Sequence, residues 1–203
     1  MLTVCIITAS CGGNRYMDTL IKKRIKQVKR GDQNAFAEIV ELFKDKVYQL
    51  CYRMVGNAHD AEDLAQEAFI RAYVNINSYD TNRKFSTWLY RIATNLSIDR
   101  LRKKKPYYFL DAEIEGAEGL TMYSQIATDE LQPDEMVESL EFQEWVQQEI
   151  NELPVMYRSV IVLKYIEELS LKEIGDILDL PIGTVKTRIH RGREALRKRL
   201  RNV

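Results

Sequence analysis

Apolar side chains recur at intervals of three and four residues along most of this chain, a spacing that places them on one face of an α-helix. Leu20, Ile21, Ile25 and Val28 begin the pattern, which continues to about residue 105 and resumes from residue 136 onward. Asp32 is expected to cap the second helix. The buried stripe of the third helix is expected to consist of Leu64, Ala65, Ala68, Phe69, Ala72 and Tyr73. No segment alternates polar and apolar residues convincingly, as a half-buried β-strand would. The sequence therefore predicts an all-α fold.

The helical pattern is interrupted between residues 106 and 135. This segment contains eight acidic residues, two glycines and no lysine or arginine, and its apolar residues follow no sustained period. Such a composition is typical of a segment with little structure of its own. We therefore predict two small helical domains, residues 17–105 and 136–203, joined by a flexible acidic linker, residues 106–135.

Residues 1–16 precede the helical pattern. Their apolar stretch is short and no basic residue comes before it, so a secretory signal is poorly supported. If Gly12 and Gly13 are encoded GGA-GGN, the DNA contains a ribosome-binding site just upstream of the codon for Met17. We interpret residues 1–16 as an upstream extension that is disordered and lies outside the fold.

Charge is strongly segregated along a chain whose 30 basic and 30 acidic residues cancel. Residues 180–203 alone carry eight Lys or Arg and a single acid, Glu194. Basic blocks separated by acidic ones suit a polyanionic partner such as nucleic acid. The three cysteines, Cys5, Cys11 and Cys51, show no CxxC spacing, so neither a disulfide framework nor a zinc site is supported. A reducing, cytoplasmic location is the simplest interpretation.

The segment from residue 170 onward has the features of two short helices joined by a tight turn. "SLKE" predicts a capping box in which Ser170 and Glu173 bond each other's backbone N–H groups. "DLPIG" predicts the turn, Gly175 is expected to let another helix lie close, and Thr184 is expected to cap the second helix. One apolar stripe then follows that helix: Val185, Ile189, Gly192, Leu196 and Leu200.

Basic residues occupy the outward side of this last helix, mostly in its N-terminal half. The arrangement matches a helix-turn-helix whose second helix enters the DNA major groove. The alternative is a merely solvated basic helix. Such a helix normally interleaves acids that pair at four-residue spacing, and this one has only Glu194. DNA recognition is therefore the better interpretation.

Three stretches together resemble the extracytoplasmic-function class of bacterial RNA polymerase sigma factors, in particular the cell-envelope stress type of Gram-positive bacteria. They are "DAEDLAQEAFIRAY" (60–73), "KFSTWLYRIATNLSIDRLRKKK" (84–105) and "LSLKEIGDILDLPIGTVKTRIHRGREAL" (169–196). The resemblance implies a sigma-2-like domain before the linker and a sigma-4-like domain after it. Asp179 stands where relatives often have Gly or Asn, and it tolerates the same left-handed turn.

The resemblance implies that the first domain binds core RNA polymerase through the outward face of the helix expected from Asp60, which is also the expected cap. The residues assigned to that face are Asp60, Asp63, Gln66, Glu67 and Arg71. Sequence alone would favour an ordinary charged helix face.

By the same resemblance, the loop "SYDTNRKFS" and the following helix read and open the −10 element. Exposed aromatic rings can stack on unpaired bases, and nearby cations can hold the separated backbone. Core packing is the alternative for Phe85 and Trp88, and a frayed basic helix end is the alternative for "RLRKKK". The assigned residues are Tyr79, Asn82, Arg83, Lys84, Phe85, Ser86, Trp88, Arg91, Asn95, Arg100 and Lys103.

The resemblance implies that the sigma-4-like domain reads the −35 element, with Arg193 and Arg197 contacting phosphates. His190 is assigned to the same surface, and the alternative is that it is a surface residue without a role in binding. The assigned residues are Thr184, Lys186, Thr187, Arg188, His190, Arg191, Arg193 and Arg197. The resemblance further implies an anti-sigma factor, often membrane-anchored, as a partner.

No constellation typical of an enzyme, a cofactor, a metal or a small-molecule substrate is evident in the sequence. A metal-dependent nuclease using Asp60, Glu62 and Asp63 is a poor alternative, because residues 60 and 62 point to different helix faces. A free-standing helix-turn-helix regulator is the second alternative, although no heptad seam for a dimer is present.

Overall fold

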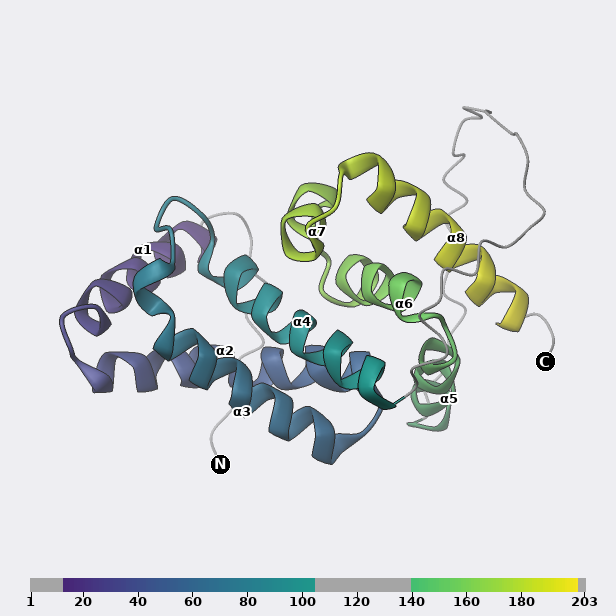
Figure 1. The fold of residues 1–203 in the computed structure, drawn as a ribbon, viewed down its shortest axis with the longest axis horizontal. Coiled ribbons are helices and arrows are strands. Elements are labelled where there is room, and N and C mark those ends of the chain that lie inside the picture. The colour runs from purple at the N-terminus through teal and green to yellow at the C-terminus, as the bar shows by residue number, and fades with distance from the viewer. Residues whose placement is uncertain (1–12, 105–139, 201–203) are drawn as a thin grey trace.

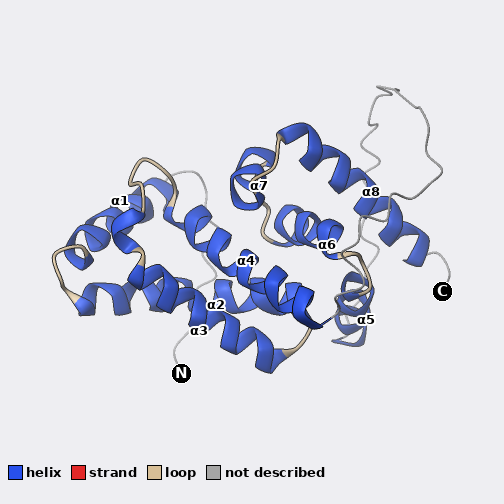
Figure 2. Cartoon of the chain, in the orientation of Figure 1, coloured by secondary structure: helices blue, strands red, loops and turns tan. Residues whose placement is uncertain are grey.

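The computed structural model describes residues 13–104 and 140–200 (Figure 1), with side chains from Met17 and Glu144 onward. These residues form helices joined by short loops, and no strand occurs among them (Figure 2), as the apolar spacing predicted. Residues 1–12 and the predicted linker lie outside the described residues. None of the described helices is long and apolar enough to cross a membrane.

Four α-helices form the N-terminal module. They are α1 (Gly13–Val28), α2 (Gln33–Val55), α3 (Ala58–Val74) and α4 (Phe85–Lys104), with a short 3-10 turn, η1 (Ile76–Ser78), after α3. Helix α1 thus begins four residues before the predicted domain boundary at Met17. Asp32 caps α2 as predicted, because its carboxylate accepts from the backbone N–H groups of Asn34 and Ala35.

The predicted cap of α3 is wrong. Asn57, not Asp60, precedes the helix in extended conformation, and its side chain accepts from the backbone N–H of Asp60. Asn57 follows Gly56, which ends α2 with φ of 70°. Two adjacent residues thus provide hydrogen bonds for the backbone groups at the end of α2 and at the start of α3. The predicted apolar stripe of α3 is buried except for Tyr73, which is 39% exposed.

The C-terminal module contains α5 (Leu140–Asn151), α6 (Val155–Ile161), α7 (Leu171–Leu178) and α8 (Ile182–Leu200), with a π-helical turn, η3 (Val162–Ile166), extending α6. The capping box of Ser170 and Glu173 is present as predicted. Asp179 adopts the left-handed conformation at the end of α7, with φ of 57°.

Two predictions about the turn are wrong. Helix α8 begins at Ile182, because the N–H of Val185 already donates to the carbonyl of Pro181, and Thr184 therefore lies inside the first turn. Gly175 does not admit another helix. A Cβ atom there would lie 2.9 Å from the carbonyl oxygen of Leu180, so glycine is required by the backbone of the turn itself.

The two modules pack against each other, which the sequence pattern did not predict. Helix α4 lies along α7, and the end of α2 lies beside α5 (Figure 1). One continuous apolar core runs from Ile39 and Leu89 in the first module to Leu163 and Ile174 in the second. The described residues therefore form two helical modules with a shared core.

Arg158 joins the modules at one end of their interface. The residue is 6% exposed, and its guanidinium donates to the carbonyl oxygens of Met54 at 2.7 Å, Leu153 at 3.2 Å and Asn151. These carbonyls lie at the C-terminal ends of α2 and α5, where intrahelical donors run out. Burial lowers the pKa of Arg158 to about 10, only partly offset by the charge of Glu152, so the side chain stays charged at neutral pH.

Candidate nucleic-acid interface

Helix α8 has a basic face that points toward solvent, because the opposite side of the helix is buried. Val185 and Gly192 are buried against the rest of the module, whereas Lys186, Thr187, His190, Arg191, Arg193 and Arg197 are exposed and Thr184 and Arg188 are partly exposed. Within the described part of the chain, no carboxylate lies within ion-pair distance of the basic residues from Lys186 to Arg197. The structure thus leaves this charge available to an anion.

The end of α8 behaves differently. Arg199 pairs with Glu149 at 2.8 Å and with Glu152 at 3.8 Å, both at the end of α5 or just after it. The Thr187 hydroxyl donates to the carbonyl of Gly183, which leaves its oxygen lone pairs free to accept. The unpaired positive charge is therefore concentrated toward the N-terminal two-thirds of α8.

The predicted −10 residues divide into a buried group and an exposed group. Tyr79 and Phe85 are each 3% exposed, and with Trp88 they form an aromatic cluster whose ring centroids lie 5.2–5.6 Å apart. The Tyr79 hydroxyl donates to the carbonyl of Arg83, and burial raises the pKa of Tyr79 to about 12. The expectation that Tyr79 and Phe85 stack on bases is wrong, because both rings pack in the core. Trp88 is partly buried.

The remaining −10 candidates lie on the surface of α4 and the loop before it. Asn82, Arg83, Lys84, Asn95 and Lys103 are exposed, and Ser86, Arg91 and Arg100 are partly exposed. The buried aromatic cluster fixes the start of α4 and so places the exposed loop residues beside it.

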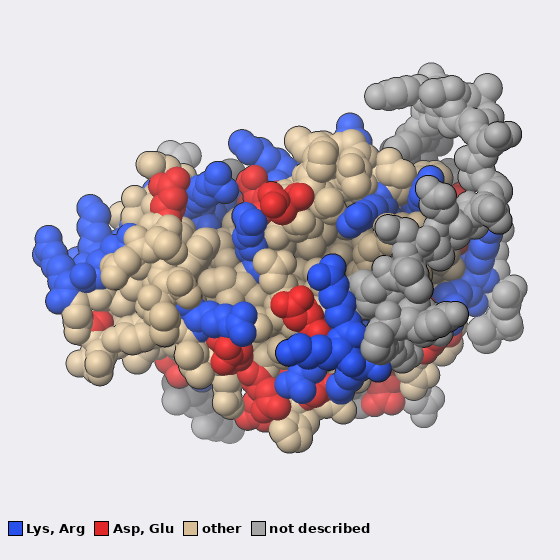
Figure 3. Space-filling view, in the orientation of Figure 1, with Lys and Arg blue, Asp and Glu red and all other residues tan. Residues whose placement is uncertain are grey.

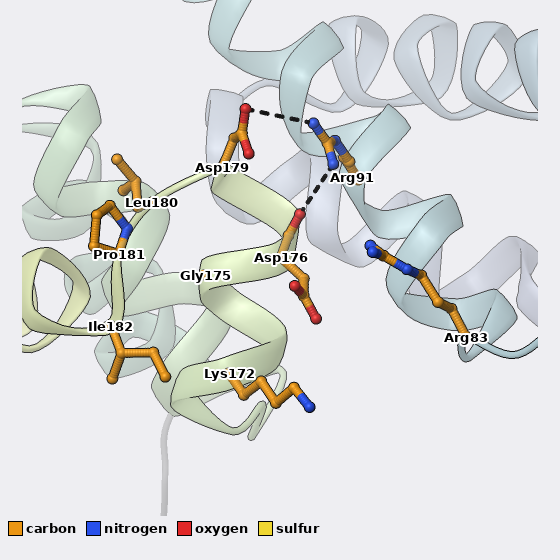
Figure 4. Close-up of a pocket in the computed structure, with 9 residues that line it drawn as sticks. All are labelled: Arg83, Arg91, Lys172, Gly175, Asp176, Asp179, Leu180, Pro181 and Ile182. Carbon is orange, nitrogen blue, oxygen red and sulfur yellow. Dashed lines mark hydrogen bonds and ion pairs between the residues drawn. The ribbon is translucent and has the colours of Figure 1, made fainter. Parts of the chain in front are cut away.

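Acidic residues of α7 and its C-terminal end lie close to two of these cations. The Lys84 ammonium lies 2.8 Å from Glu173. Figure 4 shows Arg91, which donates to the carbonyl of Asp176 at 3.3 Å and approaches the Asp179 carboxylate at 3.8 Å. Burial by itself would raise the pKa of Glu173, but hydrogen bonds from Lys84 and Ser170 outweigh it, so its pKa lies below the usual range. A pocket of about 550 Å³ opens beside these contacts, with Arg83 and Lys172 on its rim.

Part of the predicted polymerase-binding face on α3 forms ion pairs with α4. The Asp60 side chain is only 13% exposed, because Lys104 and Arg100 of α4 both bind it. The hydrogen bond from Lys104 lowers the pKa of Asp60 most. Asp60 therefore does not point outward as predicted, while Asp63 is exposed although Arg100 reaches it at 3.7 Å. Gln66 and Arg71 are exposed, and Glu67 bonds Arg71 at 2.7 Å.

Sequence reasoning missed an apolar continuation of this face. Ile70 and Val74 are 58% and 71% exposed, and Tyr73 lies between them in sequence. The signal was available, since these residues follow Gln66 and Glu67 at helical spacing. An exposed apolar group beside polar residues is a feature of protein-binding surfaces.

The arrangement does not support a metal-dependent nuclease. Among the residues that the structure describes, no group of three or more His, Cys, Asp or Glu side chains is placed to hold a metal ion. Asp60 and Asp63 instead both contact Arg100.

Comparison with known proteins assigns both modules. Residues 39–107 match the model of Sigma-70 region 2, and residues 143–196 match that of Sigma-70, region 4. The chain is 72% identical over 187 residues to the ECF RNA polymerase sigma factor SigW of Bacillus subtilis, covering 92% of this chain and all of that protein. The chain belongs to the extracytoplasmic-function sigma factors. As such it is a transcription initiation factor, and a free-standing regulator is not favoured.

More distant relatives of this sigma factor agree with the assignment. The ECF RNA polymerase sigma-E factor of Escherichia coli is 37% identical, over 85% of this chain and 90% of its own. Among solved structures, CnrH in complex with the cytosolic domain of CnrY matches with a TM-score of 0.65 at 22% identity, over 90% of this chain and 98% of that chain. That similarity shows the same two-module fold.

Proposed function

We propose that this sigma factor binds core RNA polymerase and directs it to promoters by reading a −35 element with α8 and a −10 element with α4 and the loop before it. The observation that carries the proposal is the basic, outward-facing side of α8, the second helix of the helix-turn-helix, whose charges are unpaired among the described residues. A module of the Sigma-70 region 2 type precedes it in the same chain.

For the −35 element, we assign base contacts to the first half of the exposed face of α8. Lys186 and Arg188 are cations near the helix start, the part of a recognition helix that reaches guanine edges in the major groove. Arg193 and Arg197 lie further along the helix and are assigned to phosphates. Thr184, Thr187, His190 and Arg191 complete the proposed surface.

For the −10 element, the proposal rests on polar and basic residues. Because Tyr79 and Phe85 are core residues, base contacts fall to the exposed loop and to the accessible part of Trp88. We assign Arg83 and Lys84 to the phosphates of the separated DNA strands, whose negative charge they would neutralise. Ser86, Arg91 and Asn95 extend the surface along α4, and Arg100 and Lys103 continue it toward the helix end, with Asn82 at its start.

For core polymerase, we propose the face of α3 formed by Asp63, Gln66, Glu67 and Arg71, extended by Ile70, Tyr73 and Val74. The charged part gives orientation, and the exposed apolar part gives buried area on binding. Asp60 contributes by holding α3 to α4 through Lys104 and Arg100.

The decisive experiment transcribes fragmented genomic DNA with core polymerase and the purified chain. Initiation is expected to concentrate at sites sharing two boxes at a fixed spacing. The double variant Lys186→Ala/Arg188→Ala should reduce initiation at these sites at least about tenfold, because each lost base contact costs about 1–3 kcal/mol. Arg199→Ala is the matched control on the same helix, since Arg199 is occupied by Glu149.

Two results would refute the proposal. One is initiation at positions no different from those of core polymerase alone. The other is specific binding of the chain to DNA as a dimer without polymerase, which would indicate a free-standing regulator.

Removing the charge of Glu173 is expected to raise the affinity of the free protein for single-stranded DNA carrying the −10 box recovered above. In Glu173→Gln the amide oxygen can keep the capping box while Lys84 is released. The Lys84 side chain is half-exposed, so solvent weakens the ion pair and the expected gain is no more than about fivefold. Fluorescence anisotropy at low salt measures it.

Glu144→Gln on α5 is the control for this change, because Glu144 is an exposed acid with no partner among the described residues. An equal gain in both variants would mean that net charge, and not release of Lys84, sets the affinity. No gain in either would show that DNA does not use Lys84.

We further propose an anti-sigma factor as a partner, a cytoplasmic location and a role in a cell-envelope stress response. The solved relatives CnrH and RpoE are each described in complex with another protein, CnrY and the anti-sigma factor NepR respectively. The basic surfaces of both modules are the parts that such a partner would cover. The domain limits given above stay part of this proposal, except that the first domain begins at Gly13, where α1 begins.

A further inference from the structure

Helix α1 carries an exposed basic face that none of the assignments above uses. Six of the nine residues from Lys22 to Arg30 are Lys or Arg, and no acid occurs between Thr19 and Gly31. Figure 3 shows Lys and Arg gathered at the end of the molecule where α1 lies. The helix precedes residue 39, where the match to Sigma-70 region 2 begins.

The buried side of α1 fixes which residues form this face. Ile21, Ile25 and Val28 are 5%, 0% and 6% exposed and pack in the core. Opposite them, Lys22, Lys23, Lys26 and Arg30 are all exposed. We call these four residues the α1 basic face. Lys22 and Lys26 lie one turn apart on α1, and Arg30 continues the row in the turn that follows the helix end at Val28.

This charge is not neutralised within the described part of the chain. Arg24, at the side of the helix, pairs with Glu38 at 2.7 Å. Among the residues that the structure describes, no carboxylate lies within ion-pair distance of the four residues of the α1 basic face. Like charges at four-residue spacing destabilise an isolated helix, and a solvated helix usually interleaves acids. The arrangement favours an anionic partner along the row.

The α1 basic face continues into the proposed −10 surface. Lys29 follows Lys26 by three residues and donates to the carbonyl of Tyr79 at 3.1 Å, so the end of α1 is fastened to the loop that carries Arg83 and Lys84. The rise from Lys22 to Lys26 along α1 is about 6 Å, and Arg30 lies in the turn beyond the helix end, so the row can reach about three phosphates of one strand.

We infer that the α1 basic face binds phosphates of the promoter DNA that directly adjoins the −10 segment. This inference rests on the proposed −10 role of the loop and α4. The contacts add affinity without reading sequence, because phosphates are alike at every position. They lengthen the DNA contact of the first module beyond the segment that its loop reads.

The test uses holoenzyme made from the full chain and core polymerase, with two labelled probes from a promoter identified by transcription. The short probe ends at the borders of the −10 segment, and the long probe extends about one helical turn beyond each border. Lys22→Gln/Lys26→Gln should bind the long probe about tenfold more weakly, with a salt slope smaller by about one to two, and bind the short probe unchanged.

The matched control is Lys44→Gln/Lys46→Gln, two exposed lysines of α2, which should leave both probes unaffected. A photo-crosslinker at position 26 should label DNA outside the −10 segment, and one at position 46 should not. These measurements do not depend on how stable the double variant is, because wild-type-like binding of the short probe reports a folded first module.

Several outcomes would overturn the inference. Equal weakening on both probes, equal weakening in the control, or no weakening at all would each do so. Loss of binding to vesicles of anionic lipid, with DNA binding intact, would assign the face to a membrane surface instead. If wild-type holoenzyme does not bind the short probe specifically, the proposed −10 function itself fails, and that result is separate from the effect of the variants.

Discussion

Replacement of Arg158 by alanine is expected to lower the free energy of unfolding by about 3 kcal/mol, the largest effect of any single change proposed for this protein. The guanidinium satisfies three carbonyl groups at the ends of α2 and α5, and the side chain is almost fully buried. Removing it leaves those carbonyls without a donor and leaves a cavity between the modules. Urea unfolding followed by circular dichroism measures the change.

Arg53→Ala is the matched control for this prediction. Arg53 also links α2 to α5, through a hydrogen bond of 2.9 Å to Gln147, but it is partly exposed and water can replace it. We expect a loss of less than about 1 kcal/mol for Arg53→Ala. Similar losses in the two variants would mean that Arg158 does not act through its buried carbonyl partners.

Replacement of Gly192 by leucine is expected to lower the free energy of unfolding by about 2–3 kcal/mol by separating α8 from α6. A Cβ atom at this position would already lie 3.0 Å from Cγ1 of Ile161 and 3.2 Å from Cβ of Tyr157. A larger side chain has no space, so the recognition helix must shift. Binding to −35 DNA should therefore fall together with stability.

Gly183→Leu provides the control on the same helix. No atom lies within 4 Å of a Cβ built at Gly183, and leucine is a better helix former than glycine. This variant should be as stable as the wild type or up to about 1 kcal/mol more stable. If Gly192→Leu is equally well tolerated, the close packing of α8 on α6 does not hold in solution.

The sequence was sufficient where the relevant interaction is local. The helical spacing predicted the fold class, and the caps at Asp32 and Ser170 were confirmed because each depends on residues within one turn. The caps assigned to Asp60 and Thr184 were wrong for a local reason as well. Each follows another residue able to start the helix, Asn57 and Pro181 respectively, and the earlier one is used.

Side-chain burial in irregular segments could not be predicted in the same way. Tyr79 lies in a loop with no period, so nothing in its neighbours indicates that its ring meets Phe85 and Trp88. Tyr73 lies at the edge of the apolar stripe of α3, where a small rotation decides between core and solvent. The hydrogen bonds between the α4 region and α7 join residues more than 80 positions apart. The spacing of apolar and polar residues within each segment does not indicate which distant segment it contacts.

The two ends of the interface between the modules differ in what their separation would leave behind. When Lys84 departs, Glu173 still accepts from the backbone N–H of Ser170 at 3.0 Å and from its hydroxyl at 2.6 Å, so the start of α7 remains intact. If Arg158 moved away from Met54 and Leu153, its buried charge and their carbonyl oxygens would instead lose their hydrogen-bond partners. The ion pair at the α4–α7 edge can thus break at low energetic cost, whereas the contacts of Arg158 at the opposite edge cannot.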